Sequence, residues 1–356
     1  MLNFLRKAVS TYLIVSVVIV AIVAAGVGTY LYITYSQKPT QQTTNVITNK
    51  TFTLALLDPK SGLYATGTAY ILENNFLQKY APNIKIATVG GGSGAVVKTI
   101  QSGQAQLGII NTFTAIVSIS KGVPITIIAT LKNPFLVGAF VAANSGINNV
   151  TQLKGKTFTA TTVGSATDIF AKTLAAMMNW TIGKDVKIVY VGTSESELIP
   201  VVAGQTDATI IYLESGYPYV LKGVLKFIPL FNESAPGWVL VGDKNYIMQN
   251  PDTVKAVLKG LSEGFAAYMQ NKDNSSINFI MRYYSALNLT FDEAKKIFQI
   301  QKWYTHFVIP VNLLDNELKL LQKFNVVPKN VTVDMLYTSQ FVPVVNATPD
   351  QLYLSL

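Results

Sequence analysis

Short runs of β-branched and aliphatic residues alternate along most of the chain with segments whose apolar residues repeat every three to four positions. The runs are typical of buried strands, and the repeats are typical of helices that bury one face. Strands that alternate with helices favour an α/β fold with mainly parallel sheets. The predicted strands are 52–57, 84–89, 107–110, 125–131, 157–161, 187–191 and 208–211, and the predicted helices between them are 67–79, 95–102, 167–179 and 195–203.

The last third of the chain is predicted to be helical. Pro251 begins a segment in which Val254, Leu258 and Leu261 fall on one helical face. Further helices are expected at 276–287, 291–303 and 313–324.

The chain is expected to cross twice between two lobes. It leaves the first sheet near 136–141 and returns near 238–241. The first lobe is then formed by 52–136 together with 240–345, and the second lobe, 137–239, is inserted between these segments.

The chain has no cysteine, and His306 is its only histidine. Disulfides, cysteine-ligated metal centres and thiol nucleophiles are therefore excluded. A histidine metal cluster or a Ser-His-Asp triad would depend on that single residue. We expect binding without catalysis, and no cofactor.

The net charge of +9 arises from 28 Lys and Arg against 19 Asp and Glu, and the basic residues are spread thinly. No basic run with interleaved aromatic residues is present, so nucleic acid is not an expected partner. The surplus favours an anionic small molecule or an acidic surface.

Residues 8–37 contain no charged side chain, and the segment 12–35 would span about 36 Å as a helix. Arg6 and Lys7 precede it, which predicts a cytoplasmic N-terminus and an exterior domain after residue 38. We therefore expect a transmembrane anchor within 1–35, with 9–35 holding the protein as a single-pass protein of the cell membrane.

Two other interpretations of this segment remain open. A cleaved signal peptide would usually have a shorter apolar stretch that ends at a small-residue cleavage site. The order Lys7, Ala8, Val9, Ser10 resembles the class III, pilin-type signal of archaeal surface proteins, which is cut after the small residue and retains the helix.

Residues 36–50 are polar, contain Pro39 and lack apolar periodicity, which predicts a flexible linker with a reach of about 20 Å. Asn-x-Ser/Thr sequons all lie beyond the anchor, as expected for a glycosylated exterior domain. They begin at Asn49, Asn149, Asn179, Asn232, Asn274, Asn288, Asn330 and Asn346.

Small residues follow several predicted strands, at the sheet edge where α/β proteins bind ligands and helix N-termini offer free N–H groups. Residues 90–94 read Gly-Gly-Gly-Ser-Gly and match neither a P-loop nor a dinucleotide fingerprint. This segment is either a structural turn or an anion site to which Ser93 donates a hydroxyl. Residues 163–167 offer a similar site from the other lobe, or a helix cap by Ser165 or Thr167.

Six motifs, in order, resemble those of the type 2 periplasmic solute-binding proteins. The first part of the chain is similar to the TAXI receptors, and the later part to the nitrate, sulfonate and taurine receptors of ABC importers. The motifs are Gly-Leu-Tyr-Ala-Thr-Gly at 62–67, Gly-Gly-Gly-Ser-Gly at 90–94, Ile-Gln-Ser-Gly-Gln-Ala-Gln-Leu-Gly-Ile at 100–109, Leu-Lys-Gly-Lys at 153–156, Val-Ala-Gly-Gln-Thr-Asp-Ala at 202–208 and Asn-Pro-Asp-Thr-Val at 250–254.

The resemblance, which covers about 52–305, implies two α/β lobes on a two-strand hinge with the ligand held between them. The family's lipid-anchoring cysteine is absent here, so the predicted transmembrane helix would replace the lipid. Ser215 stands where these receptors often have proline, which puts the local geometry in doubt. Carried over by motif and strand-end position, the ligand-binding candidates are Tyr64, Thr66, Ser93, Gly94, Asn111, Thr112, Ser165, Ala166, Thr167, Glu214 and Trp238.

Two of these candidates have open alternatives. Glu214 either pairs with an ammonium group of the ligand or bonds amides of the hinge. Trp238 either forms the floor of the cleft or belongs to the core. His306 is expected in a C-terminal loop, and Tyr217 and Tyr219 are expected at the rim.

The leading hypothesis is an extracytoplasmic receptor that captures a small anionic or zwitterionic organic ligand between its lobes and delivers it to a membrane permease. A surface structural or pilin-like subunit that has lost ligand binding is the alternative from another class. An enzyme similar to the pyrimidine synthases of thiamine synthesis is disfavoured, because that chemistry is understood to need a cysteine-rich segment and this chain has no cysteine.

Overall fold

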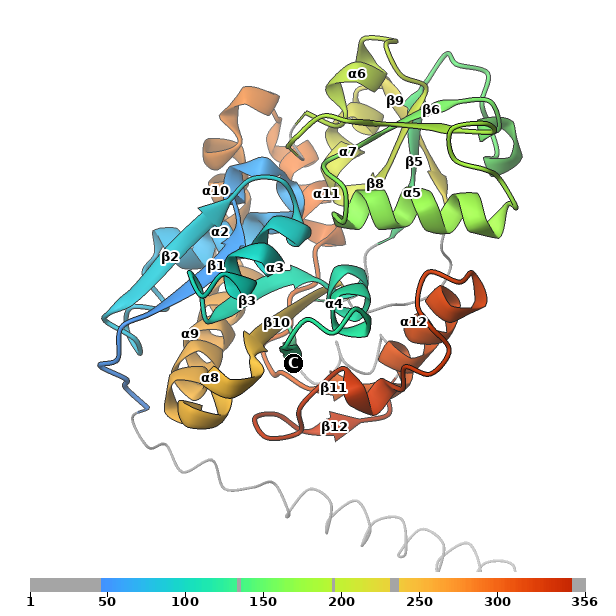
Figure 1. Cartoon of the computed structure of the whole chain (residues 1–356). Helices are drawn as coiled ribbons and strands as arrows, with labels where there is room; N and C mark the ends of the chain where they lie inside the picture. The colour runs from blue at the N-terminus through green and yellow to red at the C-terminus, as the bar shows by residue number, and fades with distance from the viewer. Residues whose placement is uncertain (1–45, 133–135, 194–195, 231–236, 348–356) are drawn as a thin grey trace, which may run out of the picture. The chain divides into compact units, whose positions relative to one another are not determined.

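A computed structural model of the chain describes residues 46–132, 136–193, 196–230 and 237–347. The predicted anchor and most of the predicted linker lie outside these residues. The described residues form a compact unit that contains two five-stranded sheets and the helices packed on them (Figure 1). The expected two-lobed α/β fold is confirmed.

The first sheet has the strand order β2-β1-β3-β10-β4. Its centre is strongly apolar, and every residue of β3 and β4 is buried. The strands are β1 (Phe52–Leu57), β2 (Ile84–Val89), β3 (Leu107–Asn111), β4 (Ile125–Thr130) and β10 (Trp238–Asp243).

The second sheet has the order β7-β6-β8-β5-β9, which repeats the pattern of the first. The central strand β8 is buried along its whole length, whereas the edge strand β7 is mostly exposed. The strands are β5 (Val137–Ala142), β6 (Thr157–Ala160), β7 (Lys187–Tyr190), β8 (Ala208–Tyr212) and β9 (Leu225–Pro229).

One strand in each sheet runs against the other four. β10 is antiparallel to both of its neighbours, β3 and β4, and β5 is antiparallel to both β8 and β9. These two strands follow the crossings between the lobes. The sheets are therefore mainly parallel, as predicted, and the reversed strand in each is the one that the chain enters from the other lobe.

The helices begin and end at residues that satisfy free backbone groups. Asn111 caps α4, Ser165 caps α5, and Thr290 forms a capping box with Glu293 at the start of α11. The helices are α2 (Thr66–Glu73), α3 (Ser93–Gln101), α4 (Thr112–Ser120), α5 (Ala166–Met177), α6 (Ile199–Val202), α7 (Leu213–Leu221), α8 (Lys244–Gln249), α9 (Pro251–Gln270), α10 (Ser275–Tyr283), α11 (Phe291–Ile300) and α12 (Val311–Lys323).

Two predicted helices are much shorter than expected, and those predicted at 276–287 and 291–303 also end early, at Tyr283 and Ile300. The helix predicted at 67–79 ends at Glu73, and Asn75 follows it with a left-handed φ of 56°, which a helix cannot continue through. The helix predicted at 195–203 is reduced to the single turn of α6, which begins with Ile199 and Pro200.

The C-terminal segment packs on the first sheet and its helices. Phe265 of α9 stacks on Trp303 with ring centroids 4.4 Å apart. The outer edge of β4 is covered because the N–H of Ile127 donates to the carbonyl of Leu336, and that of Thr338 donates back to Ile127. The short strands β11 (Ile309–Pro310) and β12 (Val344–Val345) pair beside them.

The end of the predicted linker lies on the first sheet's side of the molecule. Thr48 is buried, and its N–H donates to the carbonyl of Tyr80 at 2.9 Å. The Nζ of Lys50 donates to Asn250 at 2.8 Å. Residues 46–50 are therefore attached to the domain, and any free linker ends before them.

Among the described residues, no helix has both the length and the apolar character needed to cross a membrane. The sequon asparagines within the described ranges are all exposed, and Asn232 lies outside those ranges. The exposed sequon asparagines are Asn49, Asn149, Asn179, Asn274, Asn288, Asn330 and Asn346.

Candidate functional site

A pocket lies where the carboxyl ends of β1 and β8 meet the first turns of α3 and α5. Its cavity volume is about 10 Å³, roughly the space of one water molecule, and it opens partly to solvent. Its lining residues come from both sheets and their following helices, as expected for a ligand site of an α/β protein. They are Leu57, Tyr64, Gly92, Ser93, Thr161, Ser165, Ala166, Thr167, Ile211 and Tyr212.

Ser93 is the hydroxyl that the first sheet contributes to this pocket. It is buried at the first position of α3, and its Oγ accepts the backbone N–H of Asn111 at 3.1 Å. That bond uses an oxygen lone pair and leaves the hydroxyl proton for a second partner. Asn111 does not line the pocket, because its side chain caps α4 and donates to the carbonyl of Gly237.

The second sheet contributes three hydroxyls, which bond to one another and to Glu197. Ser165 Oγ accepts the N–H of Asp168 and lies 3.1 Å from Thr167 Oγ1. Thr167 Oγ1 donates to Glu197 Oε1 at 2.6 Å, and the Thr161 hydroxyl donates to the same oxygen. Glu197 therefore fixes the orientation of two pocket hydroxyls.

The carboxyl of Glu197 is fully buried. Burial raises the pKa of Glu197 to about 8, although the hydrogen bonds from Thr161 and Thr167 oppose this shift. Within the described structure, Glu197 Oε2 has no hydrogen-bond partner. A buried carboxyl oxygen without a partner is costly, so the proton is expected to reside there while the pocket is empty.

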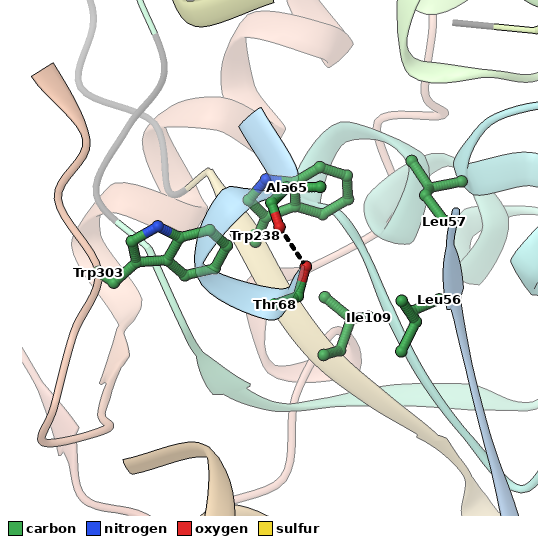
Figure 2. A pocket seen from close by; sticks show the side chains of 7 residues that line it. All are labelled: Leu56, Leu57, Ala65, Thr68, Ile109, Trp238 and Trp303. Atoms are coloured by element: carbon green, nitrogen blue, oxygen red, sulfur yellow. Dashed lines mark hydrogen bonds between the residues drawn. The ribbon is translucent and has the colours of Figure 1, made fainter. Parts of the chain in front are cut away.

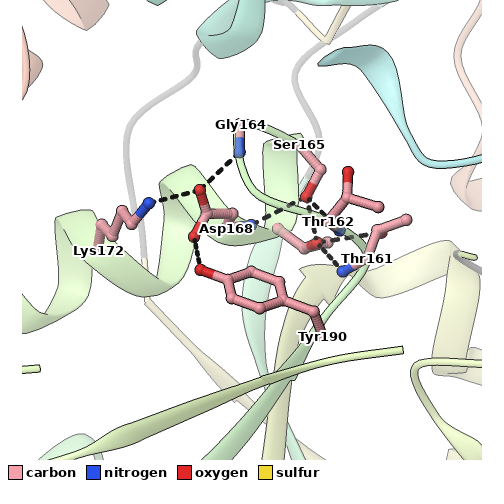
Figure 3. Close-up of polar contacts among 8 residues, drawn as sticks. Thr161, Thr162, Gly164, Ser165, Asp168, Lys172 and Tyr190 are labelled. Carbon is pink, nitrogen blue, oxygen red and sulfur yellow. Dashed lines mark hydrogen bonds and ion pairs between the residues drawn. The ribbon is translucent and has the colours of Figure 1, made fainter. Parts of the chain in front are cut away.

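Asp168 holds the loop before α5 in place (Figure 3). Its carboxylate accepts the N–H of Gly164, the Nζ of Lys172 and the hydroxyl of Tyr190, each at 2.7 Å. Burial and this hydrogen bond raise the pKa of Tyr190 to about 12, so the phenol remains a donor at neutral pH. The position of Ser165 is thereby set by the buried Asp168 carboxylate and its partners rather than by its loop alone.

The two glycine-rich loops touch each other beside the pocket. The hydroxyl of Thr162 donates to the carbonyl of Gly91 at 2.7 Å. A Cβ built on Gly92 would lie 2.8 Å from Ser165 Cβ, and one built on Gly94 would lie 2.9 Å from the carbonyl oxygen of Gly164. Glycine at 92 and 94 thus allows the two loops to approach to direct contact.

Buried aromatic rings from both sheets pack behind the pocket. Tyr64 stacks on Trp238 at 5.6 Å between centroids and lies 5.4 Å from Tyr212. Phe170 of α5 meets Tyr212 edge-on at 5.5 Å. These contacts give the pocket a rigid apolar floor that joins the two lobes.

A second cavity of about 10 Å³, lined mostly by apolar side chains, lies on the first-sheet side of this floor (Figure 2). Trp238 and Trp303 both line it, and the hydroxyl of Thr68 donates to the carbonyl of Ala65 at 2.7 Å. Trp238 therefore belongs to the aromatic floor and also lines this inner cavity.

Glu214 forms an ion pair that the sequence did not suggest. Its Oε1 lies 2.7 Å from the Nζ of Lys132, and both side chains are almost fully buried. Burial lowers the pKa of Lys132, and the nearby carboxylate partly offsets this effect. Lys132 lies two residues after β4 and Glu214 lies in the first turn of α7, so the pair joins the two lobes beside the crossing.

Five of the eleven candidate residues line the pocket, namely Tyr64, Ser93, Ser165, Ala166 and Thr167. Thr66 donates its hydroxyl to the carbonyl of Leu63, and Thr112 donates to Gly237. The sequence did not single out Leu57, Gly92, Thr161, Ile211, Tyr212 or Glu197 as ligand residues. Thr161 and Tyr212 end or directly follow strands, which is a signal that could have indicated them; Glu197 has no such signal.

The raised pKa of Glu197 predicts how stability depends on pH. The folded state holds the proton up to about pH 8, whereas an ordinary glutamate releases it near 4.5. The free energy of unfolding should therefore fall as pH rises between these values, by at most about 1.4 kcal/mol per pH unit.

Denaturant unfolding between pH 5 and 8 measures this slope. Glu197→Gln should reduce it, and adding Glu317→Gln should reduce it further, because burial also raises the pKa of Glu317 well above its ordinary value. An unchanged slope in the double variant would contradict the assignment.

Solved structures with the same architecture are two-lobed binding proteins. A Candida albicans protein described as having the generic periplasmic binding protein fold is 17% identical, with a TM-score of 0.66 over 84% of this chain and 97% of the other. The alkanesulfonate-binding protein SsuA from Xanthomonas axonopodis pv. citri is 14% identical, with a TM-score of 0.65 over 82% and 99%. The nitrate-binding protein NrtA from Synechocystis PCC 6803 is 15% identical, with a TM-score of 0.64 over 82% and 87%. The chain thus has the periplasmic-binding-protein fold.

The sequence itself matches the model of one protein family. Residues 80–275, more than half of the chain, match the family described as NMT1/THI5 like. The chain therefore belongs to the NMT1/THI5-like family, and its expected kinship with the type 2 solute-binding proteins is confirmed. No curated protein matches the chain in sequence.

Proposed function

We propose that this protein is an extracytoplasmic solute receptor that closes its two lobes on a small organic ligand and delivers it to a membrane transporter. The observation that carries the proposal is the pocket built from both lobes, with Ser93 on one side and Ser165 and Thr167 on the other. The structural neighbours named for alkanesulfonate and nitrate binding support a small polar ligand. Binding requires no covalent chemistry, so we propose no catalytic role.

The proposed ligand is anionic or zwitterionic. Ser93 can donate its hydroxyl proton, and the first turn of α3 adds backbone N–H groups on the same side. A negatively charged end of the ligand would therefore lie against the first lobe.

A thermal-shift screen of the full-length chain tests the function. Nitrate, alkanesulfonates, amino acids and dicarboxylates are the probes, and a ligand at 100 times its dissociation constant should add about 2.7 kcal/mol of stability. Ser93→Ala should weaken the best binder by about 0.5 to 3 kcal/mol, and Ser102→Ala, at an exposed position, should leave it unchanged. If no probe stabilises the protein, and native mass spectrometry finds no retained small molecule, the receptor function is wrong.

We also propose that residues 9–35 anchor the receptor in the cell membrane. The proposal is supported by the charge-free segment 8–37 and by the basic residues Arg6 and Lys7 before it. A chain without residues 1–36 should appear in the soluble fraction, and its circular dichroism should be that of a folded α/β domain. Carbonate-resistant membrane association of the shortened chain would contradict it.

A further inference from the structure

Glu197 is a buried carboxyl directly behind the second-lobe wall of the pocket. Both hydroxyls that bond its Oε1, those of Thr161 and Thr167, belong to side chains that line the pocket. Its other oxygen, Oε2, has no hydrogen-bond partner among the described residues. The carboxyl is therefore held one hydrogen bond behind the ligand space, with one oxygen unused.

The hydroxyl protons of this wall are already committed to the protein. Thr167 donates to Glu197, and Thr167 Oγ1 accepts the N–H of Thr161 at 3.0 Å. Ser165 Oγ accepts the N–H groups of Asp168 and Thr162, which directs its own proton to Thr167 Oγ1. A hydroxyl that donates inward cannot also donate to a ligand anion. The second-lobe wall is thus poorly suited to an anionic oxygen.

The elements around Glu197 do not supply a cation to balance it. β5, β6 and α6 carry no basic side chain within their bounds. Lys172 of α5 is engaged by Asp168. Glu214, the other acidic candidate, is balanced in charge by Lys132 at its Oε1, although its Oε2 also has no hydrogen-bond partner among the described residues. A cationic or N–H group of the ligand would give Glu197 the partner that the described protein does not.

Resting on the proposed receptor function, we infer that Glu197 determines ligand specificity, selecting molecules that carry a cationic nitrogen donor at the second-lobe end. The ligand class is then a zwitterion, with its anionic end against Ser93 and its ammonium group towards Glu197. Binding of the ammonium group would displace the proton that Oε2 holds in the empty pocket, whereas a plain organic anion would meet hydroxyls that donate inward. Glu197 takes the role that the sequence had offered to Glu214.

Matched pairs of ligands test this inference on the purified full-length chain. The pairs are taurine and ethanesulfonate, β-alanine and propionate, 4-aminobutyrate and butyrate, and 2-aminoethylphosphonate and ethylphosphonate. Isothermal titration calorimetry should show at least one amine-bearing member binding ten or more times tighter than its partner. Glu197→Gln keeps the side-chain shape and an oxygen for the two threonines, but places an NH₂ donor or a neutral oxygen at Oε2. It should remove most of that preference and leave the affinity for the amine-free member within about twofold.

Glu317→Gln is the matched control. Glu317 is also buried, and neither of its carboxyl oxygens has a partner in the described structure, but it lies on α12 and does not bond the pocket hydroxyls. Its variant should change stability and keep the amine preference. Equal binding of amine-bearing and amine-free members by the wild-type protein would overturn the inference and leave the receptor function standing. A preference that survives Glu197→Gln would also overturn it. If no member of any pair binds the wild-type chain but another probe of the thermal-shift screen does, this inference fails and the receptor function stands; if no probe of that screen binds either, and native mass spectrometry finds no retained small molecule, both fail.

Discussion

Glu214→Gln is expected to lower the free energy of unfolding by about 3 to 5 kcal/mol, because it removes the carboxylate that lies against the buried Lys132 ammonium. The pair is almost fully buried, with Nζ and Oε1 2.7 Å apart. Lys132 also lies 5.1 Å from the Trp303 ring, which cannot replace a carboxylate. Urea unfolding followed by circular dichroism measures the loss.

Two further variants separate charge burial from packing. Replacing both partners, Lys132→Met with Glu214→Leu, should recover most of the lost stability, because no unpaired charge remains in the interior. Lys255→Met removes an exposed ion pair with Asp252 and should cost less than about 1 kcal/mol. A double variant as unstable as Glu214→Gln alone would show that the pair stabilises through shape rather than charge.

Gly94→Ala is expected to weaken ligand binding by about 5-fold to 150-fold while leaving the protein folded. The added methyl group would meet the carbonyl oxygen of Gly164 at 2.9 Å, and a backbone oxygen cannot rotate aside as a side chain can. Overpacking of this kind costs about 1 to 3 kcal/mol, and here the cost falls on the state in which the loops touch. Calorimetry with the best binder of the thermal-shift screen measures the change.

Gly90→Ala is the control for this substitution. Gly90 belongs to the same loop, and a Cβ built on it would meet no atom within 4 Å. It should bind as the wild type does. Small-angle X-ray scattering of Gly94→Ala with ligand should show a larger radius of gyration than the wild type. Wild-type affinity in Gly94→Ala would mean that the ligand-bound state does not need this contact.

Most strands were predictable because their sequences are short runs rich in β-branched and aliphatic residues; β9 was not predicted. The predicted limits of β1 and β2 coincide with those observed, and β3 and β8 extend one residue further. The helix α4 was missed because seven of its nine residues are buried, so its sequence has no polar face and no three-to-four repeat. Helix α7 was missed because Gly216 and Pro218 lie inside it, and both residues normally argue against a helix.

The site was only half predictable, for a different reason. Loops after strands indicated Ser93, Ser165 and Thr167, because position along the chain predicts which loops share a sheet edge. Glu197 and Lys132 are charged residues, and charged residues usually lie at the surface. Their burial results from packing between segments distant in sequence, so neither could be identified from its neighbours in the chain.

Residues 46–50 determine which lobe moves when the other end of the chain is held. Thr48 and Lys50 bond Tyr80 and Asn250, which flank β2 and α9 of the first-sheet side. A force or constraint applied at the N-terminus is therefore transmitted to the first lobe as a fixed base. The second lobe is connected to that base through the crossings and the contacts between the lobes, so under the proposed function opening and closing would be a swing of the second lobe alone. The proposed transporter would then distinguish loaded from empty receptors by the position of the second lobe relative to the first lobe, whose orientation does not change.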